Sequence, residues 1–154
     1  MNTHSTQHEL QRQAPGIHSM LGLQLGTEHW LVEMTDIGEV LPLPPLTAVP
    51  LAKPWYCGVA DIRGQLYSIS DLSAFLGNGE TPRDGASRVL LINPKYGFNV
   101  GLLVGRVLGL RDTGNWHCDT GARDLLYQDE QGRSWHKLDL ADLLQRPDFL
   151  QIGN

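Results

Sequence analysis

The stretch that most constrains the fold is residues 58–72, which read GVADIRGQLYSISDL. Arg63 lies directly before Gly64 and between two apolar runs, where a long charged side chain needs a partner. Gly64 allows a tight turn because glycine adopts positive φ without steric cost. After an apolar run rich in strand-favouring residues, Asp71 opens a short helical segment that stops at Gly77. The stretch therefore predicts a strand, an Arg-Gly turn, a second strand and a short helix.

The remaining chain has the rhythm of an all-β protein. From His18 onward, short apolar segments recur about eight to twelve residues apart and are separated by turn residues, as in a barrel or sandwich. We predict strands at 20–25, 29–34 and 88–93, a hairpin formed by 125–127 and 134–138, and an amphipathic helix over 139–145 that Pro147 ends.

Two segments are less regular. The segment 41–46 carries three prolines, which cannot lie in a central strand, so it is an extended surface loop or a sheet edge. A ligand for a proline-recognising module is the functional alternative. Glycines recur every four residues at positions 97, 101, 105 and 109. We interpret residues 99–111 as one strand with its glycines on one face, where the strand bends or another backbone approaches.

Composition excludes several classes of function. A chain of 154 residues with a net charge of −5 and a pI near 5.6 is typical of one folded unit that does not bind nucleic acid, because phosphate binding needs a basic surface. No apolar run predicts a signal peptide or a membrane span, so we expect a soluble protein without membrane insertion. Residues 1–16 are polar and unpatterned, and are expected to form a flexible arm before a single domain at 17–152.

The sequence offers little catalytic chemistry. Cys57 and Cys118 have no metal-binding or redox spacing, and no phosphate-binding glycine loop, nucleophile elbow or zinc-protease motif occurs. His4 and His8 lack a third ligand, so neither a metal site nor a cofactor is predicted. A Cys118 nucleophile with a nearby histidine such as His117 is a weak alternative, because catalytic pairs come from distant segments. The sequence favours a binding module that is not an enzyme.

The central stretch resembles the signature of the CheW family of chemotaxis adaptors, in which Gly-Val-x-Asn-Leu-Arg-Gly precedes a strand, Pro-Val-x-Asp-Leu and a short helix. Six residues match in identity and spacing, namely Gly58, Val59, Arg63, Gly64, Asp71 and Leu72, and two, Ile62 and Ile69, match in type. Asp61 stands where the family has Asn, Ser68 where it has Pro, and Gly105 where it usually has Asp.

This resemblance implies a mostly β fold of two intertwined, five-stranded SH3-like β-barrels with short helices. It also implies a protein without activity of its own that bridges two partners. These are the cytoplasmic tip of a methyl-accepting chemoreceptor and the regulatory domain of a CheA-like histidine kinase. Within the family, the aromatic and proline-rich segments resemble the PilI branch, which serves type IV pili and twitching motility. The implied location is the cytoplasm, at inner-membrane chemoreceptor arrays.

The resemblance further implies which residues bind partners. The segment 37–40 matches a family pattern whose glutamate faces the motif arginine near the partner-binding groove. We therefore predict an ion pair between Glu39 and Arg63 that fixes a partner-binding surface made of Ile37, Glu39, Gly58, Val59, Ile62, Arg63 and Gly64. A purely structural ion pair is one alternative. An SH3-like module that binds peptides through exposed aromatic residues, unrelated to chemosensing, is another.

Overall fold

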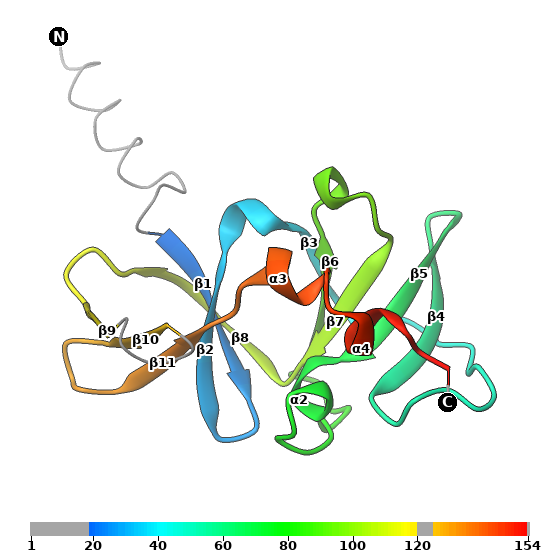
Figure 1. Ribbon diagram of the computed structural model, residues 1–154, viewed down its shortest axis with the longest axis horizontal. Helices are drawn as coiled ribbons and strands as arrows, with labels where there is room; N and C mark the ends of the chain where they lie inside the picture. The colour runs from blue at the N-terminus through cyan, green and yellow to red at the C-terminus, as the bar shows by residue number, and fades with distance from the viewer. Residues whose placement is uncertain (1–18, 120–124, 154) are drawn as a thin grey trace, which may run out of the picture.

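The computed structural model describes residues 19–119 and 125–153, so the arm predicted at 1–16 lies outside the described residues. The described chain is mostly β (Figure 1). Its strands are β1 (Ser19–Leu25), β2 (Glu28–Glu33), β3 (Ile37–Pro42), β4 (Tyr56–Ile62), β5 (Gln65–Asp71), β6 (Arg88–Ile92), β7 (Val100–Val104), β8 (Arg106–Asp112), β9 (His117–Asp119), β10 (Leu126–Gln128) and β11 (Ser134–Lys137). Its short helices are α2 (Leu72–Phe75), α3 (Leu140–Leu143) and α4 (Pro147–Leu150), with 3-10 turns η1 (Met34–Asp36) and η2 (Pro94–Tyr96).

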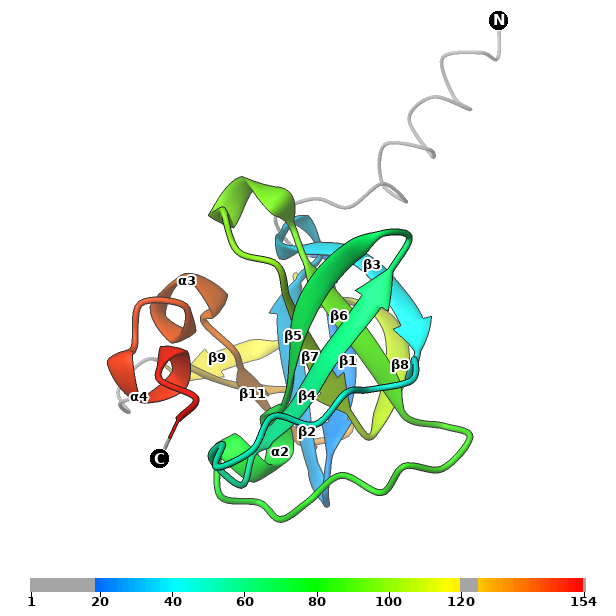
Figure 2. The ribbon, with the colours of Figure 1, turned by 90° about the vertical axis from the view of Figure 1, so that its right-hand side faces the viewer.

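The strands form two sheets that share the chain in an intertwined order. Sheet A has six strands in the order β8-β1-β2-β11-β10-β9, and sheet B has five in the order β3-β6-β7-β5-β4. The chain begins in sheet A, builds all of sheet B, and returns to sheet A through β8 (Figures 1 and 2). The parallel pairs β2/β11 and β5/β7 join segments that are distant in sequence. The mostly β, intertwined fold is therefore confirmed, but its two halves are sheets rather than closed barrels in the described residues, and sheet A has one strand more than the five expected.

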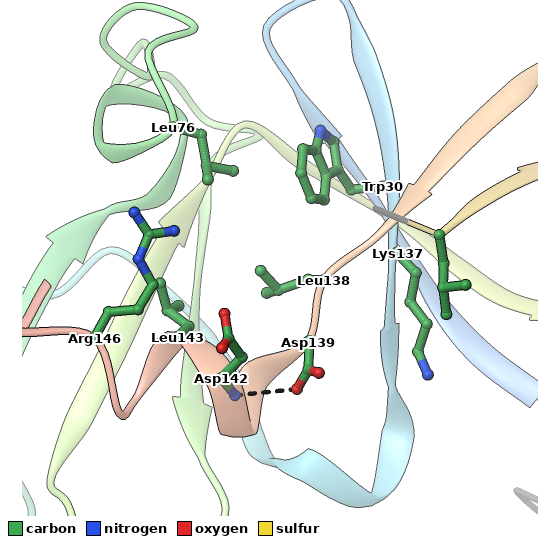
Figure 3. A pocket seen from close by; sticks show the side chains of 9 residues that line it. Trp30, Leu76, Lys137, Leu138, Asp139, Asp142, Leu143 and Arg146 are labelled. Atoms are coloured by element: carbon green, nitrogen blue, oxygen red, sulfur yellow. Dashed lines mark hydrogen bonds between the residues drawn. The ribbon is translucent and has the colours of Figure 1, made fainter. Parts of the chain in front are cut away.

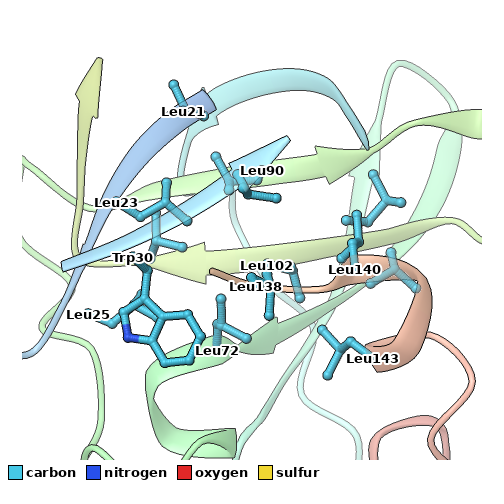
Figure 4. Close-up of a cluster of buried hydrophobic side chains, with 14 of the residues drawn as sticks. Leu21, Leu23, Leu25, Trp30, Leu72, Leu90, Leu102, Leu138, Leu140 and Leu143 are labelled. Atoms are coloured by element: carbon cyan, nitrogen blue, oxygen red, sulfur yellow. The ribbon is translucent and has the colours of Figure 1, made fainter. Parts of the chain in front are cut away.

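Side chains on both faces of the central strands are buried. In β6, Leu90 and Ile92 pack in a central core between the two sheets, while Val89 and Leu91 pack in a second core within sheet B. The separation follows from the strand geometry, because successive side chains point to opposite faces. Figure 4 shows the central core, to which both sheets and the helices contribute. A third core, which includes Met20, Leu31 and Trp135, lies on the other face of sheet A.

The short helix after the central motif forms as predicted. The Asp71 Oδ1 atom accepts a hydrogen bond from the Ala74 N–H at 3.2 Å, which caps α2. Asp71 is 6% exposed, and its carboxylate also accepts from the Thr81 N–H at 2.8 Å and the Thr81 hydroxyl at 2.6 Å. These bonds satisfy a buried charge. Gly77 follows the helix at φ 85°.

The prediction of one strand over residues 99–111 is wrong in one respect, because the segment forms two strands. The chain bends at Gly105, so that β7 belongs to sheet B and β8 to sheet A. The Gly105 N–H donates to the Gln24 carbonyl at 3.1 Å, and a Cβ at this position would lie 3.0 Å from the same oxygen. The expected close approach of another backbone is therefore confirmed, but it marks the crossing between the sheets.

The prolines also differ in part from expectation. Pro42 ends β3, an edge strand, which confirms the edge alternative for the start of segment 41–46. The helix predicted over 139–145 is shorter, as α3 covers Leu140–Leu143 with Asp139 as its N-cap. Pro147 follows α3 and also begins α4, since proline suits the first turn of a helix.

No helix among residues 19–119 and 125–153 is long and apolar enough to cross a membrane.

Candidate functional site

The β4–β5 hairpin presents the motif arginine at its tip. Ile62 pairs with Gln65, so the loop consists of Arg63 and Gly64, whose φ angles are 53° and 86°. Positive φ at both positions is the type I′ turn, which matches the twist of a two-stranded ribbon. The Gly64 N–H donates to Asp61 Oδ1 at 2.9 Å and stabilises this turn. Arg63 is thereby held in a left-handed conformation that residues with a side chain rarely adopt.

The predicted ion pair between Arg63 and Glu39 is present. Nη1 of Arg63 donates to Glu39 Oε2 at 3.3 Å, and Nη2 donates to Oε1, so the contact is bidentate. Glu39 lies on β3 and Arg63 directly follows β4, and these are the two edge strands of sheet B. The pair therefore connects opposite edges of the sheet. Hydrogen bonding to Glu39, followed by its charge, raises the pKa of Arg63.

The ion pair is more exposed than the apolar sequence around it suggests. The side chains of Arg63 and Glu39 are 67% and 42% exposed. The guanidinium therefore stays largely in water although apolar runs flank it in the sequence. Exposed ion pairs contribute little to stability. The pair is accordingly accessible to a partner.

Gly58 and Val59 hold a covering segment against β4. The Thr47 N–H donates to the Val59 carbonyl at 2.8 Å, and the Val59 N–H donates to the Thr47 carbonyl at 2.9 Å. Gly58 has φ 136°, and a Cβ there would lie 2.5 Å from the Thr47 carbonyl oxygen. Only glycine fits this approach. Gly58 is buried and Val59 is half-buried.

The two predicted isoleucines differ from the charged pair in their surroundings. Ile62 is 8% exposed and packs in the core of sheet B. Ile37 is half-buried against the central core. The family resemblance placed Ile62 on the partner-binding surface, but strand alternation turns its side chain inward with that of Ala60. Its contribution is therefore to anchor the hairpin.

Sequence reasoning missed Leu66 as a surface residue of this hairpin. Leu66 pairs with Asp61 across β4 and β5 and is 63% exposed. Val40, on β3 beside Glu39, is 41% exposed. The alternation of inward Ala60 and Ile62 with outward Asp61 was the signal that places Leu66 outside. Exposed apolar side chains therefore lie on β3, which carries Glu39, and on β5, which follows the Arg63–Gly64 turn.

Other chemistry considered from the sequence gains no support from the geometry. His117 and Cys118 are neighbours in β9, so their side chains point to opposite faces of the strand. Burial, followed by the charge of Asp71, raises the pKa of the Cys57 thiol to about 11. Within the part of the chain that the structure describes, no three His, Cys, Asp or Glu side chains form a group able to hold a metal.

Trp55, Phe75 and Phe149 contact one another while packing against the central core.

Comparison with known proteins decides the family. The family model described as "CheW-like domain" matches residues 19–116, which is more than half of the chain. The chain belongs to the CheW-like domain family. Its match begins with β1 and includes all of sheet B, with the Arg63 hairpin.

Two curated relatives of this CheW-like chain agree with the assignment. Protein PilI of Pseudomonas aeruginosa is 37% identical over 101 residues, which is 66% of this chain and 56% of that protein. A protein named as a probable chemotaxis protein CheW, from Rhizobium etli, is 30% identical over 93 residues, which is 60% of this chain and 59% of that protein. The chain thus spans less than two thirds of the length of either relative.

A solved structure shows the same fold. The crystal structure of the scaffolding protein TtCheW from Thermoanaerobacter tengcongensis superposes with a TM-score of 0.71 at 17% sequence identity. The match covers 87% of this chain and 96% of that chain. The fold of two intertwined sheets is therefore shared with that structure over most of the chain.

Proposed function

We propose that this CheW-like protein is a non-enzymatic signalling adaptor that couples a transmembrane methyl-accepting chemoreceptor to a CheA-type histidine kinase. Its family and its 37% identity to a protein named PilI support this proposal. The same identity favours a chemosensory pathway that controls type IV pili and twitching motility. The site of action is then the cytoplasm, at receptor arrays on the inner membrane.

The observation that carries the proposal is the strained and exposed position of Arg63. Asparagine or glycine suits the first position of a type I′ turn better than arginine does. The exposed pair with Glu39 offers little stability in return. Strained residues held by their surroundings are concentrated at functional sites. The presence of arginine at position 63 is therefore better explained by a need for a positive charge at the hairpin tip than by a contribution to the folding of the hairpin.

Glu39 gives this charge a fixed direction. Because the carboxylate engages both Nη atoms, the guanidinium keeps one plane and one orientation, and its remaining donors face solvent. Val40, which follows Glu39 on β3, and Leu66, on β5 just after the Arg63–Gly64 turn, add exposed apolar side chains. A partner segment with a carbonyl or carboxylate acceptor beside an apolar side chain fits this surface.

A binding experiment in the source cell tests the proposal. The wild-type protein and an Arg63→Asn variant serve as baits in lysate, because asparagine keeps the left-handed turn while removing the cation. We expect the wild type to recover a histidine kinase and a chemoreceptor, and the variant to lose at least one of them. Arg106→Asn, at an exposed arginine of β8 in sheet A, is the matched control and retains both. Recovery of neither partner by the wild type contradicts the adaptor function.

A charge swap separates a partner-binding role of the ion pair from a structural one. Arg63→Glu places two carboxylates face to face and weakens binding, and adding Glu39→Arg restores the attraction with reversed polarity. If the pair only supports the hairpin, the double variant recovers partner binding. If the partner contacts Arg63 itself, the double variant recovers stability in urea denaturation but not binding. Failure of the double variant to recover stability contradicts a direct interaction between the two residues.

The SH3-like peptide module is not favoured by this surface. The aromatic contacts among the described residues involve side chains that pack against the cores, such as Trp135, which is 1% exposed. If the pull-down recovers proline-rich proteins in place of a kinase and a receptor, that alternative replaces the adaptor.

A further inference from the structure

A second surface feature lies apart from the Arg63 hairpin. A cavity of about 520 Å³ opens between β2, the end of α2, and the segment that runs from β11 into α3. Figure 3 shows the side chains of Trp30, Leu76, Leu138 and Leu143 around it, with charged groups at its margin. Its volume lies in the range of about 300–1,000 Å³ that is usual for ligand sites. None of its lining residues belongs to the Glu39–Arg63 site.

The aromatic wall of this cavity is held in place before any ligand arrives. The Trp30 Nε1–H donates to Glu28 Oε1 at 3.0 Å, and the Trp30 ring stacks on His136 with 4.9 Å between centroids. The Asn78 side chain donates to the same Glu28 oxygen at 2.7 Å. One hydrogen bond and one ring contact therefore hold the indole, and Asn78 in turn holds its partner Glu28. A fixed wall lowers the entropy cost of binding.

The charges at the margin leave an excess of negative charge. Lys137 is paired with Glu33 at 3.3 Å, and Arg146 is paired with Asp148 at 2.8 Å. Asp139 and Asp142 also line the cavity. Within residues 19–119 and 125–153, neither of these two carboxylates forms an ion pair, and the Asp139 carboxylate accepts the backbone N–H of Asp142 as the α3 cap. The cavity thus combines apolar walls with two carboxylates that a cation would complement.

We propose that this cavity binds a partner segment in which a lysine or arginine lies between apolar side chains. The apolar side chains cover Leu76, Leu138 and Leu143. The cation reaches Asp139 and Asp142, and its aliphatic stem lies along the Trp30 ring, where a cation is also attracted to the indole face. A lysine or arginine provides both the stem and the charge in one side chain, which neither a simple metal ion nor an uncharged peptide offers.

A peptide titration followed by NMR tests this proposal. The probes are acetyl-Leu-Lys-Leu-amide, acetyl-Leu-Glu-Leu-amide and acetyl-Gly-Lys-Gly-amide, added to the full ¹⁵N-labelled chain. We expect the first peptide to shift the Trp30 indole N–H and the amides of Leu76 and Leu143. The glutamate peptide and the glycine peptide each bind at least about fivefold more weakly, because one reverses the charge and the other removes the apolar contacts.

Two variants test whether the carboxylate of Asp142 attracts the lysine of the peptide. Asp142→Lys replaces an exposed carboxylate on α3. It is expected to lower the affinity for the lysine peptide by about fivefold or more and to remove the preference for this peptide over the glutamate peptide. Glu80→Lys, at an exposed carboxylate outside the cavity, is the matched control and leaves the affinity unchanged. Adding salt weakens binding of the lysine peptide to the wild type, because the pairing is exposed to solvent.

Three results overturn the proposal. The first is the absence of shifts at Trp30, Leu76 and Leu143 at millimolar peptide. The second is equal binding of the lysine and glutamate peptides to the wild type. The third is equal weakening by Asp142→Lys and Glu80→Lys, which shows a response to net charge alone. Because the test needs neither receptor nor kinase, its failure is distinguishable from failure of the adaptor function.

Discussion

Arg63 occupies a backbone conformation that its own side chain disfavours, and two neighbours hold it there. Asp61 accepts the Gly64 N–H, and Glu39 binds the guanidinium. The family usually has asparagine at the position of Asp61, and both side chains offer the same Oδ1 acceptor. The departure from the family pattern therefore preserves the turn while adding a negative charge beside Arg63.

Removing the acceptor at Asp61 is expected to weaken the hairpin. Asp61→Ala leaves the Gly64 N–H without its partner and lowers the free energy of unfolding by about 0.5–1.5 kcal/mol. Asp61→Asn keeps the acceptor and serves as the control. Urea denaturation measures both variants, and equal stability of the alanine and asparagine variants contradicts the role of this bond.

Cys57 is expected to react slowly with alkylating reagents. Burial, followed by the charge of Asp71, raises the pKa of its thiol to about 11 from the ordinary value of 9.0. Because only the thiolate reacts, a shift of this size lowers the thiolate fraction at pH 8 about a hundredfold. Iodoacetamide labelling of a Cys118→Ser variant, compared with N-acetylcysteine, measures this effect. A rate within threefold of the free thiol is inconsistent with it.

Strand β7 needs a glycine at position 101, where it pairs with β5 on one side and β6 on the other. A Cβ at Gly101 would lie 2.7 Å from Ile69 Cδ1 and 2.8 Å from Val89 Cγ1, both in the core of sheet B. Gly101→Ala is therefore expected to lower the free energy of unfolding by about 1–3 kcal/mol through overpacking. Gly85→Ala, in a turn with open space around the new methyl group, is the control. Thermal or urea denaturation compares them, and equal effects exclude a packing cause.

Turns η1 and η2 are joined by a hydrogen bond that links the connection between the sheets to sheet B. The Tyr96 hydroxyl donates to Asp36 Oδ1, which Lys95 also contacts at 3.3 Å. Hydrogen bonding to Asp36, followed by burial, raises the pKa of Tyr96 to about 12 from its ordinary value of 10.0. The folded state therefore retains this proton more strongly than the unfolded chain does.

The pH dependence of this bond follows from the direction of the shift. Its stabilisation is complete below about pH 10 and is lost as the pH rises towards 12, because the unfolded chain releases the proton first. Tyr96→Phe is expected to lower the free energy of unfolding at pH 7 by about 1.5 kcal/mol and to flatten the decline between pH 10 and 12. Urea denaturation across this range measures both effects. An unchanged alkaline slope in the variant contradicts the assignment.

At the scale of the whole molecule, the central core makes the two sheets one cooperative unit. Side chains from β1 and β2 of sheet A meet those from β6 and β7 of sheet B, and the helices add Leu72, Leu140 and Phe149. Neither sheet keeps its inner face buried without the other. The protein is therefore expected to unfold in one transition, although each sheet has a smaller core of its own.

Truncation of a central side chain tests this cooperativity. Leu102 is fully buried in the central core, and Leu102→Ala is expected to lower the free energy of unfolding by about 2–5 kcal/mol. Tryptophan fluorescence reports mainly on sheet A, whose strands carry Trp30 and Trp135, while far-ultraviolet circular dichroism reports on both sheets. Coincident curves from the two probes are expected in the variant. Two separated transitions contradict a shared core.

Local chemistry made several features readable from the chain alone. Turn residues fixed the Arg63 hairpin and the hairpin between β10 and β11, and Asp71 fixed the start of α2, because each depends on neighbours within a few residues. The pairing of Glu39 with Arg63 came from the family resemblance, and the geometry places the two side chains in contact. The arm at 1–16, the domain limits at 17–152 and the binding roles of the site residues stay predictions.

Only the tertiary structure decided which face each strand turns inward and where the chain changes sheets. The spacing of the glycines predicted a bend or a close backbone approach, but not that the chain changes sheets at Gly105, because that depends on the Gln24 carbonyl, far away in sequence. Ile62 and Leu66 are both apolar hairpin residues, yet one is buried and the other is exposed, since only one face of the hairpin packs in the core of sheet B. The Trp30 cavity likewise forms only where α2, α3 and sheet A meet. Sequence determined the turns, caps and strand rhythm, which short-range contacts dictate, while long-range packing determined exposure and the sites that depend on it.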